Sequence, residues 1–201
     1  KERNRDFKKI IKKIEFDIGK EAVSELNSRR TDAEGFVGSS SSSSSTSQVN
    51  ISDHDVIFWF GDLNYRVDES IPCEQVIELC EANEFDALIA KDQLTIERAA
   101  GRAFSVFQEG PLTFRPTYKY EPGTDTYSPK RTPGWCDRIL WQTHPRKTDI
   151  PDRVTLLDYK RSEINVSDHK PVMANFLLKI EEALPEQRDK VSKEVLASVK
   201  P

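Results

Sequence analysis

The sequence contains no apolar run long enough to cross a membrane, and its start lacks the marks of a secreted protein. Residues 1–16, KERNRDFKKIIKKIEF, are charged throughout, without an initiator Met or the apolar core of a signal peptide. We therefore expect no transmembrane segment. The missing Met leads us to interpret the chain as an excerpt from a longer protein.

Cysteine is scarce, and an excess of positive charge is missing. The three cysteines (Cys73, Cys80 and Cys136) are an odd number without metal-ligand spacing, which favours a reducing compartment. Cys73 and Cys80 lie seven residues apart on an expected helix, so we interpret them as small core fillers. The net charge of −4 argues against a general nucleic-acid binder.

The N-terminal part predicts one helix and one disordered segment. Phe7, Ile10, Ile11 and Ile14 follow the spacing of an amphipathic helix, whose basic side we interpret as solvated surface. Residues 28–52 are rich in serine and cannot bury enough apolar area to offset their ordering entropy. We expect a disordered insertion there.

The remaining pattern interleaves strands with helices, which predicts the α/β class. We expect a strand over 55–60 that is buried on both faces, a helix opening at Pro72, and a short helix over 93–100. Later strands are expected at 139–141, 154–159 and 172–180. Residues 181–201 predict a charged helical connector to a following domain.

Four polar clusters lie in loops or at the ends of these strands, where catalytic groups concentrate. They are GDLNYR (61–66), PTYKY (116–120), PKRTPGWCDR (129–138) and SDHKP (167–171). No Ser or Cys stands in a nucleophile context, so the attacking group is expected to be water.

The clusters together supply the groups that stabilise charge on a phosphoryl group. In an extended backbone Asp62 and Asn64 would leave the same face, placing a carboxylate base beside an amide. Asp137 would orient the imidazole of His169 and favour its protonated form. Taken alone, GDLNYR also fits a capped turn, and Asp168 with His169 also fits a capped strand entry.

These motifs resemble the inositol polyphosphate 5-phosphatases of the endonuclease/exonuclease/phosphatase superfamily. The resemblance rests on FWFGDLNYR (58–66), FRPTYKY (114–120), RTPGWCDRILW (131–141) and SDHKPV (167–172), and it covers about residues 1–180. It implies a layered α/β sandwich, of which this chain would be the C-terminal half. It also implies a cytoplasmic enzyme that works peripherally on endomembranes or the plasma membrane.

The resemblance implies a role for each matching residue. Asp62 would deprotonate the attacking water, Asn64 would bind phosphoryl oxygens, and His169, held by Asp137, would donate to a non-bridging oxygen. Asp168 would contact the metal ion, Mg²⁺, indirectly. A further set would bind the 4-phosphate of the inositol ring: Tyr118, Lys119, Lys130 and Arg131.

The sequence departs from the family pattern in two places. Pro129 replaces the first lysine of the usual Lys-x-Arg, which leaves Lys130 one position late, so either the loop shifts to let Lys130 serve or the 4-phosphate is bound more weakly. Gly134 stands where alanine is usual and would loosen the same loop slightly. The family's metal-binding Glu and its Ser-x-His-Leu motif would lie upstream of Lys1. The trailing LPEQRDKV resembles the link to the following domain in OCRL-like, type II members.

Three readings remain at this point. The first is a Mg²⁺-dependent phosphatase that removes the 5-phosphate of phosphatidylinositol 4,5-bisphosphate or related inositol phosphates, with the headgroup at a membrane surface and no nucleic-acid partner. The second is a nuclease or deadenylase of the same superfamily, which would have no use for PTYKY. The third is a non-catalytic binding module.

Overall fold

The computed structural model describes residues 1–17, 48–144 and 152–180, together with 187, 190–191 and 193–194. Its helices are α1 (Glu2–Lys13), α3 (Cys73–Glu81), α4 (Asp86–Ile89), α5 (Gln93–Ala99) and the 3-10 helix η1 (Ile51–Asp53). Its strands are β1 (Glu15–Asp17), β2 (Gln48–Asn50), β3 (Val56–Asp62), β4 (Gln108–Glu109), β5 (Asp137–Thr143), β6 (Val154–Arg161) and β7 (Val172–Leu178).

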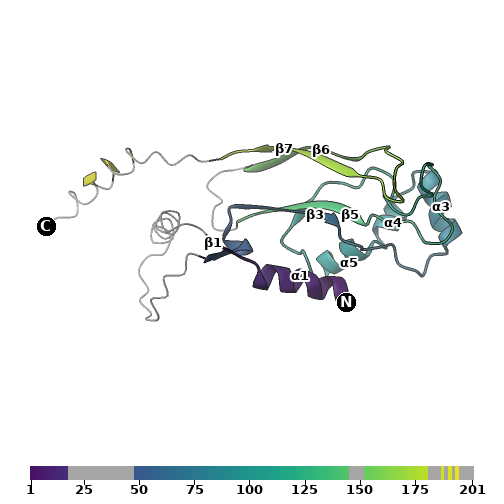
Figure 1. Ribbon diagram of the computed structural model, residues 1–201, viewed down its shortest axis with the longest axis horizontal. Coiled ribbons are helices and arrows are strands. Elements are labelled where there is room, and N and C mark those ends of the chain that lie inside the picture. The colour runs from purple at the N-terminus through teal and green to yellow at the C-terminus, as the bar shows by residue number, and fades with distance from the viewer. Residues whose placement is uncertain (18–47, 145–151, 181–186, 188–189, 192, 195–201) are drawn as a thin grey trace.

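The described elements form layers (Figure 1). One layer is the antiparallel sheet β3-β5-β4, and a second is the antiparallel pair β6-β7, which runs along one face of the first. Helices α1 and α5 cover the other face, while α3 and α4 lie at one end. The structure therefore has the mixed, layered architecture that the sequence predicts. No described helix is long and apolar enough to span a bilayer.

The predicted disordered insertion is wrong at its C-terminal end. Residues 48–50 form β2, which pairs with β1 and buries Val49 to 6% exposure. The turn η1 then follows, closed by a reciprocal capping box between Asn50 and Asp53. These local bonds order a polar stretch. Residues 28–47 and nearly all of the predicted connector 181–201 lie outside the described residues.

The helix expected after Pro72 is two helices. Asn83 takes a left-handed φ of 59°, which ends α3 before α4 begins. The apolar stripe continues across the break, because Val76, Cys80 and Leu88 are all fully buried in one cluster. Cys73 is only half-buried, so the core-filler interpretation holds for Cys80 alone.

Strand β3 is not buried on both faces. Its Trp59 packs against Phe104 and Phe107 on the helix side. On the other side Phe58 contacts Phe176 of β7 at 5.0 Å, but Phe60 is 71% exposed. The expectation of a doubly buried strand therefore fails at Phe60, because no described element covers that position.

Helix α1 is fastened to this sheet by one aromatic side chain and several polar contacts. The Phe7 ring lies 4.0 Å from the Phe104 ring and 5.3 Å from that of Trp59. Asn4 donates to Glu97 of α5 and accepts from the Tyr65 hydroxyl. The amphipathic helix predicted for this segment is confirmed, and its orientation on the domain is fixed.

A buried arginine joins three elements beneath the polar end of the sheet. Arg138 is fully buried and donates to Asp92 at the start of α5 and to Glu109 of β4. Asp92 also caps α5 by accepting from the Thr95 backbone N–H. Because Arg138 follows Asp137 directly, these pairs fix the beginning of β5.

Replacing Arg138 with leucine should destabilise the fold by about 3–5 kcal/mol, because the buried carboxylate of Asp92 would lose its cation and that of Glu109 would keep only Arg98. Urea unfolding of the variant measures the loss. Arg5→Leu is the control, since its pair with Glu2 is exposed and contributes well under about 1 kcal/mol. Equal stabilities of the two variants would contradict this role.

Candidate active site

Two of the predicted site residues face each other at the end of the sheet. Asp62 ends β3, Asp137 begins β5, and the two are Cα partners in the antiparallel ladder. Gly61 before them has a φ of +132°, a conformation that only glycine adopts readily. Like charges placed directly opposite each other are unfavourable, so this pair requires compensating partners.

Asn64 does not stand in the extended geometry predicted for it. Its φ is 56°, and its backbone N–H donates to Asp62 Oδ1 at 2.8 Å in a tight turn. The prediction that both side chains leave one face of a strand is therefore wrong. The turn nevertheless keeps Asn64 beside Asp62, because the Asn64 N–H is hydrogen-bonded to the Asp62 carboxylate.

Arg66 orients the amide of Asn64, a role that sequence reasoning missed. Its Nε and Nη2 donate to Asn64 Oδ1 at 3.3 and 3.2 Å. The Asn64 amide is thereby set to direct its NH₂ donors elsewhere. The Arg66 guanidinium also lies 5.2 Å from the centre of the Tyr118 ring. The position of Arg66 within the GDLNYR motif is the sequence signal that could have pointed to this role.

Asp137 and His169 form the pair that the sequence predicts. His169 Nδ1 lies 2.9 Å from Asp137 Oδ2, and the same oxygen accepts from the Thr117 hydroxyl at 2.6 Å. The hydrogen bond to Asp137 raises the pKa of His169 above its ordinary value, and the charge of Asp62 adds to the effect. With Nδ1 bound, Nε2 is the ring nitrogen left for a substrate.

Lys119 is paired with Asp168 at the same end of the molecule. Its Nζ lies 2.8 Å from Asp168 Oδ2. This hydrogen bond lowers the pKa of Asp168 and raises that of Lys119. The centre of the neighbouring Tyr118 ring lies 4.5 Å from that of the His169 ring. The backbone of Tyr118 also forms bridges with His169 and Gly134.

The predicted 4-phosphate residues Lys130 and Arg131 are not drawn into this cluster. Both are exposed, and within the described residues neither forms an ion pair. Their loop starts next to Lys119, because the Ser128 N–H donates to the Lys119 carbonyl at 2.8 Å. Their contribution to phosphate binding stays a prediction.

Gly134 permits a close approach of two loops. A side-chain carbon at this position would lie 3.2 Å from the Arg66 Cα. The interpretation that this glycine merely loosens its loop is therefore incomplete, because it also lets the PKRTPGWCDR loop pack against the GDLNYR loop.

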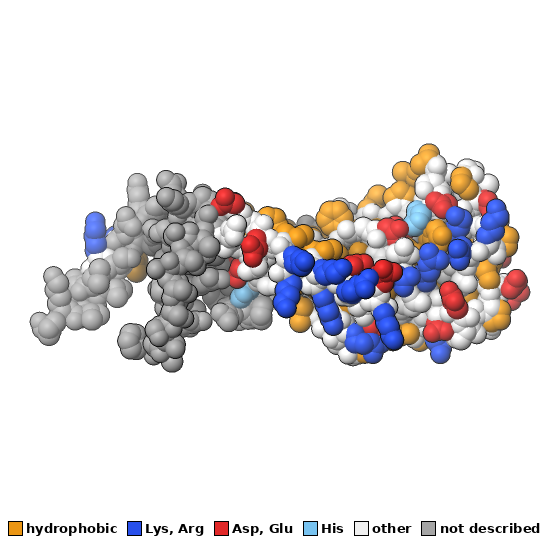
Figure 2. Space-filling view, turned by 60° about the horizontal axis from the view of Figure 1, so that its bottom comes forward, with side chains coloured by type: hydrophobic (Ala, Val, Ile, Leu, Met, Phe, Trp, Pro, Cys, Tyr) orange, Lys and Arg blue, Asp and Glu red, His pale blue; other side chains and the backbone are white. Residues whose placement is uncertain are grey.

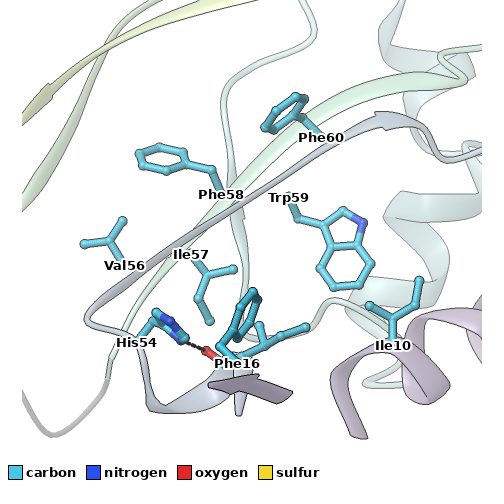
Figure 3. A pocket seen from close by; sticks show the side chains of 9 residues that line it. Ile10, Phe16, His54, Val56, Ile57, Phe58, Trp59 and Phe60 are labelled. Atoms are coloured by element: carbon cyan, nitrogen blue, oxygen red, sulfur yellow. Dashed lines mark hydrogen bonds between the residues drawn. The ribbon is translucent and has the colours of Figure 1, made fainter. Parts of the chain in front are cut away.

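The polar site and an apolar surface lie in two different hollows. Asp62, Asn64 and the start of α1 line a hollow of about 570 Å³. A second hollow of about 410 Å³ lies along β3 and is lined almost wholly by apolar side chains (Figure 3). Its one histidine, His54, is bonded to backbone carbonyls. The second hollow therefore offers nothing for phosphoryl chemistry.

The donor atoms present suit a hard metal ion. Asp62, Asn64 and Asp168 offer oxygen, whereas burial raises the pKa of the Cys136 thiol to about 12 and leaves no thiolate. No group of three ligating side chains occurs within the described residues. Mg²⁺ needs only one or two carboxylates besides waters and substrate phosphates, so these residues fit part of such a site.

Comparison with known proteins agrees with this geometry. Residues 1–175 match the family model described as "Endonuclease/Exonuclease/phosphatase family 2". The chain belongs to this family.

Relatives within the family carry more specific names. The chain is 44% identical over 139 residues to type I inositol polyphosphate 5-phosphatase 5 of Arabidopsis thaliana, covering 65% of the chain and 24% of that protein. It is 35% identical to synaptojanin-1 of Rattus norvegicus, covering 98% of the chain and 12% of that protein. The chain thus spans about a quarter or less of these relatives.

Solved structures give the same fold with two different functions. The 5-phosphatase domain of spsynaptojanin, in complex with inositol (1,4)-bisphosphate and calcium ion, matches with a TM-score of 0.58 and 31% identity, over 75% of this chain and 45% of that one. A Cimex nitrophorin in a ferrous NO complex matches with a TM-score of 0.56 and 35% identity, over 63% and 42%. Function must therefore be argued from the site residues rather than from the fold.

Replacing Asp137 with asparagine should lower the pKa of His169, because it removes the hydrogen-bonded carboxylate that raises this pKa. NMR titration of the imidazole measures the change. Asp62→Asn is the matched control: it also removes one negative charge, but one that is not bonded to the ring, so its effect should be smaller. A larger effect of Asp62→Asn would contradict the assigned pair.

The same pair makes stability depend on pH. Because the folded pKa of His169 is raised, its contribution is complete below the unfolded value of 6.5 and is lost as the pH rises through the folded value. In Asp137→Asn this part of the stability profile should flatten.

Proposed function

We propose that this chain contributes to a phosphatase that removes the 5-phosphate of phosphatidylinositol 4,5-bisphosphate or a related inositol phosphate. The observation that carries the proposal is that Asp62 stands opposite Asp137 in the sheet and that Asp137 is hydrogen-bonded to His169. It supplies a proton acceptor and a proton donor at the same end of the sheet. The similarity to named inositol polyphosphate 5-phosphatases supports the substrate class.

Asp62 serves as the base in this proposal. Its side chain is exposed at the strand end, and Oδ1 is fixed by the Asn64 N–H. The other oxygen accepts the proton of the attacking water, which then adds to phosphorus. The Asn64 NH₂ group, set by Arg66, donates to a phosphoryl oxygen and holds the group in line.

His169 serves as the donor. The Asp137 carboxylate favours the protonated imidazole, so Nε2–H can donate to a non-bridging oxygen as negative charge develops there. Thr117 holds the same carboxylate oxygen from the other side. The bond between phosphorus and the inositol oxygen breaks, that oxygen takes up a proton from solvent, and Asp62 releases its proton to solvent. The products are therefore the inositol hydroxyl and inorganic phosphate.

A divalent metal ion is part of the proposal, with Mg²⁺ as the ion. Asp62 would supply an oxygen ligand, whereas Asn64 and Asp168 would act through water because their side-chain oxygens already accept hydrogen bonds. When bound, the ion neutralises charge on the phosphoryl group and the leaving oxygen.

Lys119 provides recognition of a neighbouring 4-phosphate. It is a point cation next to Tyr118, which adds a hydroxyl donor. The Tyr118 ring in turn contacts the His169 ring. In the free protein Asp168 neutralises Lys119. A 4-phosphate would therefore displace the Asp168 carboxylate from Lys119 or share Lys119 with it. This competition favours substrates that carry more negative charge than a single phosphate.

Asp62→Asn should reduce kcat by about 10² to 10⁴ with little change in KM, because the side chain keeps its shape but loses its basicity. The assay is Mg²⁺-dependent phosphate release by the full-length protein. Asp158→Asn, on the exposed part of β6, is the matched control and should keep its activity. More than half of the wild-type turnover in Asp62→Asn would refute the role of the base.

Lys119→Ala should raise KM far more for substrates with a 4-phosphate than for those without one, because the lost contact is with that group. Lys160→Ala, an exposed pair on β6, is the control. Equal effects on both substrate types would place Lys119 away from the 4-phosphate. Lys130→Ala tests the shifted lysine in the same assay.

A further inference from the structure

Positive charge is concentrated on one helix of an otherwise acidic chain. Residues 1–13 carry seven Lys or Arg against two acidic residues, a net of +5, whereas the whole chain carries −4. Figure 2 shows Lys and Arg side chains in a row over the part of the surface where α1 lies. The helix thus has the opposite sign to the rest of the chain.

Four basic side chains of α1 are not neutralised locally, although Arg5 pairs with Glu2. Lys8, Lys9, Lys12 and Lys13 are all exposed, and the structure gives none of them a carboxylate partner among the described residues. Cations three and four positions apart on a helix repel each other. A helix that needed only solubility would mix both signs, so this arrangement favours an anionic partner.

The basic side chains surround a shallow hollow of about 430 Å³. We call this surface the basic face, and its charged residues are Lys1, Arg5, Lys8, Lys9, Lys12, Lys13 and Arg102. Besides Lys1, which precedes α1 directly, only Arg102 comes from outside the helix, and it is partly neutralised by Glu97. The surface is therefore formed almost entirely by one helix.

The basic face adjoins the hollow that holds the candidate base. Lys1 lines both hollows, and the second one reaches Asp62 and Asn64. Helix α1 is fixed relative to them because Phe7 packs on Trp59 and Asn4 bonds to Tyr65. A surface bound to the basic face would therefore be held at a constant position relative to Asp62.

Exposed apolar side chains lie in α1 and directly after it, outside the basic hollow. Ile10 is 36%, Ile14 41% and Phe16 46% exposed, and all three come from α1 or directly after it. Lys and Arg beside exposed apolar groups is the combination with which helices bind at an anionic bilayer surface. A nucleic acid would bind the cations but would leave these apolar side chains exposed.

We propose that the basic face of α1 binds the surface of an anionic lipid bilayer and thereby holds phosphorylated headgroups beside Asp62. The lysines contact lipid phosphate and carboxylate groups, and Ile10, Ile14 and Phe16 enter the headgroup boundary. The placing of headgroups beside Asp62 rests on the function proposed above, whereas the binding of anionic lipid by α1 does not.

The test changes four lysines that lie away from the candidate site. Lys8, Lys9, Lys12 and Lys13 are replaced together by glutamine, which keeps helix propensity, and in a matched variant by arginine, which keeps the charge. The full-length proteins are sedimented with vesicles of phosphatidylcholine alone or mixed with phosphatidylserine. Phosphoinositide is left out, so binding is measured independently of the active site.

Wild type and the arginine variant should bind the phosphatidylserine vesicles, and the glutamine variant should bind roughly 100-fold or more weakly, because each surface cation contributes about fivefold. Binding should also weaken with added salt. Turnover of a soluble inositol phosphate should stay within about twofold in all three proteins, since none of the four lysines lines the hollow with Asp62.

Equal vesicle binding by the glutamine and arginine variants would overturn the proposal, as would equal binding to both vesicle types. Loss of oligonucleotide binding without loss of vesicle binding would assign the face to nucleic acid instead. If no protein hydrolyses inositol phosphates, the proposed function fails, and the vesicle comparison still decides the role of the basic face.

Discussion

The carboxylate of Asp137 is the point on which the candidate site depends. One of its oxygens accepts hydrogen bonds from Thr117 and His169, which lie 20 and 32 residues away along the chain. Asp137 is also the ladder partner of Asp62. Through this one residue, motifs from β3, from the PTYKY segment and from the entry to β7 meet at one end of the sheet, and its hydrogen bond raises the pKa of the His169 imidazole.

The protein places like charges together there and stabilises them from below. Asp62 faces Asp137, and Asp168 adds a third carboxylate near His169. Bonds from Asn64, Thr117, His169 and Lys119 satisfy these groups on the surface side. Beneath them, buried Arg138 holds the start of β5 to α5 and β4. Charges that are placed this close together and have perturbed pKa values are typical of functional sites.

The sequence was sufficient for the elements with strong periodicity, because that signal is local. It placed α1, α5 and β5 to β7 and it paired Asp137 with His169. It was insufficient where geometry depends on distant contacts. The Arg66 contact with Tyr118, for example, joins separate motifs. Likewise, β2 is ordered by pairing with β1 across a long gap in sequence. The sequence also failed at the left-handed turn of Asn64, although that turn is closed locally by Asp62.

The most direct test of the central claim is the identity of the phosphate that is released. The full-length protein is incubated with inositol 1,4,5-trisphosphate and Mg²⁺ in ¹⁸O-labelled water, and the products are analysed by ³¹P NMR and mass spectrometry. Attack by water activated at Asp62 predicts inositol 1,4-bisphosphate and inorganic phosphate that carries the label. Release of the 1- or 4-phosphate, or no release from this substrate together with cleavage of a single-stranded oligonucleotide, would contradict the account.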